Sequence, residues 1–209
     1  NFSLQLQEVQ PGFILTKEKF QNKLSRIKTS IPIINIQEPL PLLKETIILR
    51  EITQEETSTI IYSSGTTSQP KGVKLQHKNV VAATQNMIEF LGITEDDIYL
   101  NVLPLSHSFG LGNTHMTFRQ GGTIIIEKNA INIPQFLQKI IDEKATVFAA
   151  APATFRLILD SNKDLLSKCQ NLKTMVTNST YIPPETTSEI LKILPTTQFH
   201  TYYGLTEAS

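Results

Sequence analysis

Short apolar runs and amphipathic stretches alternate along most of the chain. Runs rich in β-branched residues predict buried strands, which we expect at 59–62, 98–105, 123–126, 145–150, 172–177 and 199–203. Apolar residues spaced three and four apart predict helices, which we expect over 80–91, 133–141, 154–159 and a stretch opened by Pro184. Strands that alternate with helices are typical of an α/β fold with a largely parallel sheet and flanking helices.

The first fifty residues predict a smaller unit of the same kind. An apolar run at 13–15, a helical face of Phe20, Leu24 and Ile27, and a second run at 31–36 indicate a parallel strand–helix–strand unit, with Thr16 as the helix N-cap. The stretch 37–44 holds two prolines and resembles a linker, and 46–52 is a candidate short strand. Neither stretch suggests chemistry.

Charge and cysteine content narrow the function classes. Nineteen basic and nineteen acidic residues cancel, so the chain offers no basic field for nucleic acid and no polybasic membrane patch. The single cysteine, Cys169, excludes an intrachain disulfide and fits the reducing cytoplasm, where we expect it to be a structural thiol. No stretch approaches the length of a membrane span. The acidic run 94–97 favours a solvated turn over a metal site.

The stretch 59–75 carries the strongest chemical pattern. A β-branched run meets five hydroxyl residues around Gly65, followed by Lys71 and Gly72; the five are Ser63, Ser64, Thr66, Thr67 and Ser68. Hydroxyls, turned backbone amides and an ammonium all donate hydrogen bonds, which suits a polyphosphate. The neighbours of Lys71 are Pro70 and Gly72, so this is not a Walker A loop. By composition alone, an ordinary surface loop is the alternative.

The ordered string Y-S-S-G-T-T-S-Q-P-K-G-V resembles the signature loop of the adenylate-forming superfamily. Its members include acyl-CoA synthetases, aryl-CoA ligases, luciferases and the adenylation domains of peptide synthetases. The resemblance implies that residues 63–68 and Lys71 bind ATP. One departure is Ser68, where the family usually has glycine. It also implies that residues 1–209 are a fragment of the family's large N-terminal domain, an expectation that the missing initial methionine supports.

The segment 202–209 resembles the family's second ATP motif, Tyr-Gly-x-Thr-Glu. By that resemblance Tyr203 stacks on adenine, Gly204 and Thr206 lie at the nucleotide, and Glu207 binds Mg²⁺, a cation that takes hard oxygen ligands and keeps most of its waters. Many relatives have Gly-Gly-Ala next to the adenine, where this chain has Asn178, Ser179 and Thr180. These three are therefore candidate ATP-binding residues.

His107 lies in L-P-L-S-H-S-F-G-L, just after a predicted strand, where open α/β sheets place ligands. The acyl-CoA synthetase branch has a similar segment, which implies that His107 lines the substrate pocket. Amino-acid-activating relatives carry an aspartate here, and none occurs over 104–112. His77, His115 and His200 lack this context and are expected to be structural.

The resemblance implies an acid–thiol ligase. A carboxylic acid and ATP would give an acyl-adenylate and pyrophosphate, with Lys71, Thr206 and Glu207 as catalytic residues, and the acyl group would pass to CoA or to the phosphopantetheine of an acyl carrier protein. We expect the 209-residue piece to be inactive by itself. The alternatives are a non-catalytic module that binds a nucleotide or a partner, and an amino-acid adenylation domain.

Overall fold

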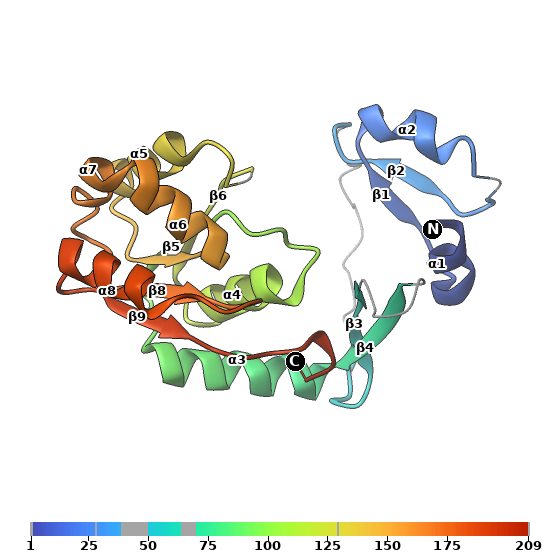
Figure 1. Ribbon diagram of the computed structural model, residues 1–209. Helices are drawn as coiled ribbons and strands as arrows, with labels where there is room; N and C mark the ends of the chain where they lie inside the picture. The colour runs from blue at the N-terminus through green and yellow to red at the C-terminus, as the bar shows by residue number, and fades with distance from the viewer. Residues whose placement is uncertain (1, 28, 39–49, 64–69, 129, 209) are drawn as a thin grey trace. The chain divides into compact units, whose positions relative to one another are not determined.

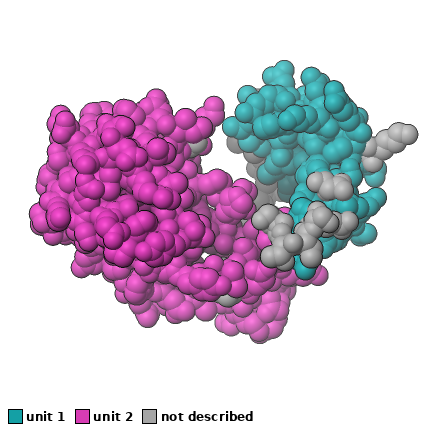
Figure 2. Space-filling view, viewed as in Figure 1, with its two compact units in different colours: residues 1–52, 64–72 teal, residues 53–63, 73–209 magenta. Residues whose placement is uncertain are grey.

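The chain forms two compact units (Figures 1 and 2). The computed structural model describes residues 2–27, 29–38, 50–63, 70–128 and 130–208. The first unit, teal in Figure 2, comprises residues 1–52 and 64–72, and the second, magenta, comprises 53–63 and 73–209. Among the described residues, no helix is both long and apolar enough to cross a membrane.

The first unit is a small parallel strand–helix–strand arrangement, as predicted. After helix α1 (Phe2–Val9), strand β1 (Ile14–Thr16) pairs in parallel with β2 (Ile33–Asn35), and helix α2 (Glu18–Leu24) connects them. Thr16 is not the helix N-cap that we expected, because it pairs with Asn35 in the ladder and Lys17 takes the cap position. The expected linker and strand over 37–52 lie mostly outside the described residues, and 50–52 form no strand.

A β-ribbon leads into the long helix of the second unit. Strand β3 (Thr57–Ser63) forms a two-stranded sheet with β4 (Lys71–Gln76), which runs directly into helix α3 (His77–Leu91). Gln76 and Asn79 form a reciprocal capping box at the start of α3. Gly92 ends the helix as its C-cap, with a left-handed φ of 63°.

The main sheet has five parallel strands, which confirms the predicted fold class. They are β5 (Ile98–Asn101), β6 (Thr123–Ile126), β7 (Val147–Ala149), β8 (Thr174–Thr177) and β9 (Gln198–Thr201), in the order β6-β5-β7-β8-β9. Four of the predicted runs, 98–105, 145–150, 172–177 and 199–203, extend beyond the observed strands. The run 98–105 stops early because the Asn101 side chain accepts a hydrogen bond from the Leu103 amide, 2.8 Å away, and turns the chain before Pro104.

Helices cover both faces of this sheet (Figure 1). Leu100, Phe148 and Met175 point to one face, where they pack against α5 (Ile133–Asp142), α6 (Pro152–Ser161), α7 (Lys163–Leu166) and α8 (Pro184–Ile193). Tyr99 and Val176 point to the other face, toward α3 and α4 (Ser108–Arg119). Neighbouring strand residues thus fill two separate cores, as the alternation of side chains along a strand requires.

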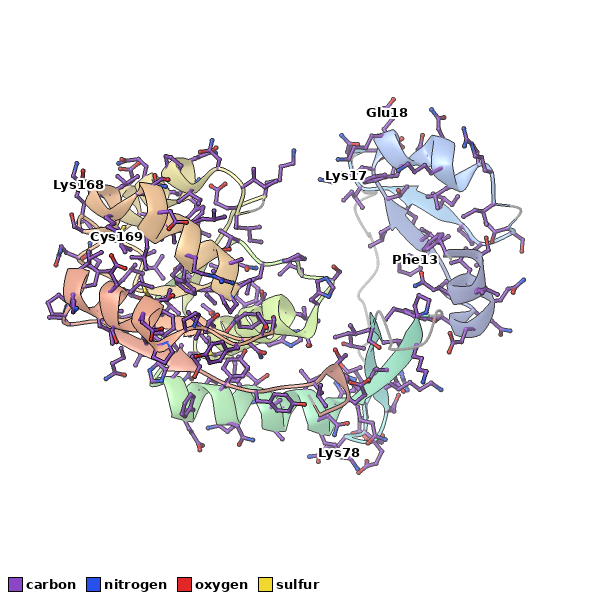
Figure 3. All side chains as sticks on the ribbon, viewed as in Figure 1. Phe13, Lys17, Glu18, Lys78, Lys168 and Cys169 are labelled. Carbon is purple, nitrogen blue, oxygen red and sulfur yellow. The ribbon has the colours of Figure 1, made fainter. Side chains whose placement is uncertain are left out.

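Two features of this unit differ from the sequence prediction. Helix α4 was not predicted, because its buried face carries small and polar residues; the hydroxyls of Thr114 and Thr117 donate to the carbonyl oxygens of Gly110 and Asn113. The expected solvated turn at 94–97 is solvated only in part, because Asp97 is 1% exposed and pairs with Lys173. Cys169 (Figure 3) is a buried free thiol, as expected.

Candidate active site

A cavity of about 90 Å³ lies in the second unit between α3 and α4. Most of its lining side chains are apolar or small. The lining residues are Thr59, Ile61, Leu75, Val80, Ala83, Thr84, Met87, Ser108, Phe109, Leu111, Gly112, His115, Asn178, Tyr202 and Gly204. The apolar spacing over 80–91 predicts that Val80, Thr84, Met87, Ile88 and Leu91 all belong to the core. Ile88 and Leu91 are core residues and Met87 packs against the same core, whereas Val80, Thr84 and Met87 also line the cavity.

The topology of the sheet explains the position of the cavity. The chain leaves β5 to form α4 on one face, whereas it leaves the neighbouring strand β7 to form α6 on the other. Such a divergence opens a crevice at the carboxyl ends of parallel strands. Segments that follow β5, β8 and β9 all contribute to the lining, through Ser108, Asn178 and Tyr202.

Tyr202 forms an aromatic wall of the cavity. Its ring meets the ring of Phe109 edge-on, with 5.6 Å between centroids. Burial raises the pKa of Tyr202 to about 12, although a hydrogen bond with the Asn178 side chain opposes the rise. The phenol is therefore neutral at pH 7 and can donate or accept a hydrogen bond.

The predicted second ATP motif lies beside this cavity. Gly204 lines it, and Thr206 begins a short 3₁₀ helix (Thr206–Ala208), with its hydroxyl oxygen 3.5 Å from that of Ser108. Tyr203 is 86% exposed, which leaves its ring free to stack on a planar group. Glu207 is exposed as well. The segment thus presents an aromatic ring, a hydroxyl and a carboxylate next to one another.

The segment after β8 approaches the same motif closely. A Cβ built on Gly204 would lie 3.5 Å from the Asn178 amide nitrogen. The Asn178 side-chain oxygen accepts a hydrogen bond from the Ser179 amide, and Ser179 has a φ of 86°. Positive φ favours glycine, the residue that the family resemblance places in this segment. Ser179 and Thr180 are exposed and do not line the cavity.

The remaining predicted residues are less informative. Ser63 is the last residue of β3, Lys71 is an exposed residue at the start of β4, and the predicted phosphate-loop residues 64–68 lie outside the described residues.

The positions of His107 and His115 differ from those we expected. His107 is an exposed N-cap residue of α4 and is not among the residues that line the cavity. His115, expected to be structural, does line it, and burial lowers the pKa of its imidazole. The sequence signal that we missed is spacing: His115 follows Ser108 by seven residues and Leu111 by four, on one helical face.

The described residues contain no group of three or more His, Cys, Asp or Glu side chains that could form a protein-only metal site. A single exposed carboxylate, such as Glu207, nevertheless suits Mg²⁺, since this ion is usually bound by one or two carboxylates together with phosphates and water.

Comparisons with known proteins give a consistent picture. A family model described as AMP-binding enzyme matches residues 4–209. The acyl-CoA ligase sidI of Aspergillus fumigatus is 31% identical over 177 residues, which cover 83% of this chain and 30% of the ligase. The chain spans about 30% of the length of the curated relatives it matches.

Solved structures share the fold. The ATP-bound MatB of Rhodopseudomonas palustris superimposes with a TM-score of 0.83 at 19% identity, covering 99% of this chain and 42% of MatB. A protein named VinN, solved with L-aspartate, gives a TM-score of 0.80 at 20% identity, covering 99% of this chain and 54% of VinN. At these identities the likeness shows the fold alone.

Proposed function

Because this chain belongs to the family of AMP-binding enzymes, we propose that its protein uses ATP to activate a carboxylic acid and then transfers the acyl group to a thiol. The observation that carries the proposal is that the cavity and the second ATP motif share residues. Gly204 lines the cavity and lies two residues before Thr206. A carboxylate held in the cavity would therefore be near a nucleotide held by the motif. We propose further that residues 1–209 are part of one N-terminal AMP-binding domain.

The first step forms the acyl-adenylate. A carboxylate oxygen bonds to the α-phosphorus of ATP, and the bond from that phosphorus to the bridging oxygen of pyrophosphate breaks, so that pyrophosphate leaves with the electron pair. This step needs positioning and charge neutralisation more than covalent catalysis. We assign the neutralisation to Lys71 and the hydroxyls of residues 63–68, and the contact to the phosphate region to Thr206.

The second step transfers the acyl group. A thiolate attacks the acyl carbon, the bond to the AMP oxygen breaks, and the thiol proton goes to solvent. The thiol belongs to CoA or to the phosphopantetheine of an acyl carrier protein. These thiols and ATP are available in the cytoplasm, where we place the protein.

Glu207 would hold Mg²⁺ together with the phosphates of ATP. The ion would neutralise charge on the leaving pyrophosphate. Tyr203 would stack on the adenine, and Asn178, Ser179 and Thr180 would border it. The positive φ of Ser179 supports this assignment, since it is a backbone conformation that glycine adopts readily.

Amino-acid activation is the second candidate, since VinN was solved with L-aspartate. An ammonium group in a desolvated cavity requires an acidic partner. None of the described residues that line the cavity is acidic. The cavity therefore favours a carboxylic acid without an α-amino group. A contact of His107 with the substrate is a separate part of the proposal.

Acid-dependent ATP–pyrophosphate exchange tests the function. The purified full-length protein, of which residues 1–209 are a part, is assayed with Mg²⁺ and a panel of carboxylic and amino acids, and Glu207→Gln is compared with Glu95→Gln, another exposed carboxylate. We expect exchange with carboxylic acids, a loss of about 10- to 100-fold for Glu207→Gln from one charge-assisted contact, and no change for Glu95→Gln. Absence of exchange with every acid would contradict the proposal.

A further inference from the structure

We propose that Gly112 on α4 and Met87 on α3 together limit the size of the acyl group, and that the accepted group carries no charge. This inference rests on the proposed function, because it takes the cavity as the place of the acyl group. It goes further by naming the residues that select the acid.

One face of each helix lines the cavity. On α3 the lining residues are Val80, Ala83, Thr84 and Met87; on α4, Phe109 lines the cavity in addition to the set Ser108, Leu111, Gly112 and His115. Both sets follow the spacing i, i+3, i+4, i+7 of a single helical face. The cavity is therefore a gap between two packed helices, and its width depends on the side chains that face across it.

Gly112 has no backbone reason to be glycine. Its φ is not positive, and it lies within α4, where alanine would favour the helix more. Gly110, two residues earlier, differs, since a Cβ there would lie 2.5 Å from the Pro104 carbonyl oxygen. A Cβ on Gly112 would meet only Met87, at 3.5 Å from Sδ, which is an ordinary contact. We therefore infer that the absence of a side chain at Gly112 keeps this part of the cavity open.

Met87 lies next to Gly112 in the lining of the cavity, within contact distance of a Cβ at that position. Its side chain is half-buried, in contrast to the fully buried Met116 and Met175 of the cores. An unbranched thioether adapts to the shape of a neighbouring group. Together the two residues determine how much of an acyl chain fits between the helices.

The cavity also selects against charge. Among the described residues that line it, none is Asp, Glu, Lys or Arg. Its titratable lining groups, Tyr202 and His115, are neutral at pH 7, because burial raises the pKa of the phenol and lowers that of the imidazole. A second carboxylate or an ammonium on the acyl chain would lose its hydration without gaining a partner.

The test uses acids of graded length. Straight-chain monocarboxylic acids, and the same chains with a terminal amine or second carboxylate, are assayed for kcat/KM by pyrophosphate exchange and for binding by calorimetry. The variants are Gly112→Ala, Met87→Ala and the double variant. Gly12→Ala and Val81→Ala are matched controls, because Gly12 has open space around it and Val81 is exposed on α3 outside the cavity lining.

We expect Gly112→Ala to lower kcat/KM for the longest accepted acid about tenfold or more, as for one surplus methylene in a pocket, and to leave the shortest acids unchanged. Met87→Ala should extend the accepted length, and the double variant should return toward the wild-type profile. The charged chains should be rejected by all variants. The controls should not change the profile.

Each outcome separates this inference from the proposed function. A wild-type protein that exchanges pyrophosphate with a length profile unaffected by Gly112→Ala and Met87→Ala overturns the size limit. Preference for a charged chain overturns the second part. If no acid supports exchange, the proposed function fails. Calorimetry then decides this inference. It is supported if the longest acid that binds is shorter for Gly112→Ala than for the wild type, and it is overturned if no acid binds or if this length does not change.

Discussion

Asp97 and Lys173 form an ion pair, with 2.7 Å between Oδ1 and Nζ, at the amino-terminal edge of the main sheet. The Thr146 hydroxyl donates to the same carboxylate at 2.6 Å, and the Thr94 amide donates at 2.8 Å. Asp97, Thr146 and Lys173 directly precede β5, β7 and β8. One buried carboxylate thus aligns three strands from the end opposite the cavity.

Replacing this carboxylate by an amide should destabilise the fold. Asp97→Asn removes the ion pair and weakens hydrogen bonds to a charged acceptor, so we expect the free energy of unfolding to fall by about 3 kcal/mol. Urea denaturation measures the change. The exposed neighbour Asp96 provides the control, since Asp96→Asn should change stability by no more than about 0.5 kcal/mol. Equal effects of the two substitutions would contradict the role of Asp97.

The same cluster predicts a dependence of stability on pH. Burial alone would raise the pKa of Asp97, but hydrogen bonds from Lys173, Thr146 and Thr94 and the charge of Lys173 hold it below its ordinary value of 3.8. In acid the unfolded chain therefore binds this proton first. The contribution of Asp97 is complete above about pH 4 and is lost as the pH falls through the folded pKa. The slope of unfolding free energy against pH in this range should be smaller in Asp97→Asn.

Lys71 should act on catalysis and not on folding. The exposed Lys71→Ala should lower kcat/KM for ATP about 10- to 100-fold, as for the loss of one charge-assisted phosphate contact. Lys74→Ala, an exposed lysine on the same strand, is the matched control. Unchanged pyrophosphate exchange in Lys71→Ala, with both variants folded, would reject the assignment.

Ser179 should carry backbone strain. Its φ of 86° is unfavourable for a residue with a Cβ, so Ser179→Gly should raise the free energy of unfolding by about 1 kcal/mol. Ser179→Ala keeps the Cβ and removes only the hydroxyl, and it should bring no gain. Thermal unfolding of the two variants distinguishes relief of strain from loss of the hydroxyl; a gain in both would point to the hydroxyl.

Cys169 should resist modification in the folded protein. Its side chain is buried, and burial raises the pKa of the thiol to about 12, so little thiolate forms near neutral pH. We expect iodoacetamide at pH 8 to label Cys169 only as fast as the fold opens, with immediate labelling in denaturant. Rapid labelling without denaturant would show that the thiol is accessible.

The sequence predicted those helices and strands in which apolar residues recur at a regular spacing. Helix α3 follows the 3.6-residue spacing of its apolar residues up to Gly92, and the predicted strands alternate with helices as observed. Helix α4 was not predicted, because its buried residues include Gly110, Asn113 and Thr117. A pattern of apolar residues does not reveal the burial of small and polar side chains.

The site was predicted in part. Local motifs identified Gly204, Thr206 and Asn178, which lie in or beside the cavity. The lining residues Met87 and His115 were not predicted, because they face the cavity only when α3 and α4 pack together. Asp97 escaped for a similar reason, since its partners Thr146 and Lys173 are far along the chain.

The crossover connections of the sheet also determine the order in which the segments that line the cavity come together. Synthesis delivers α3 and α4 long before Tyr202 and Gly204, and parallel neighbours pair only after their crossover connections have formed. Until β9 joins β8, the two helices present an apolar wall with no opposite side. The cavity is therefore complete only after β9 has paired with β8, and a bound acid would stabilise the paired state without assisting the earlier steps.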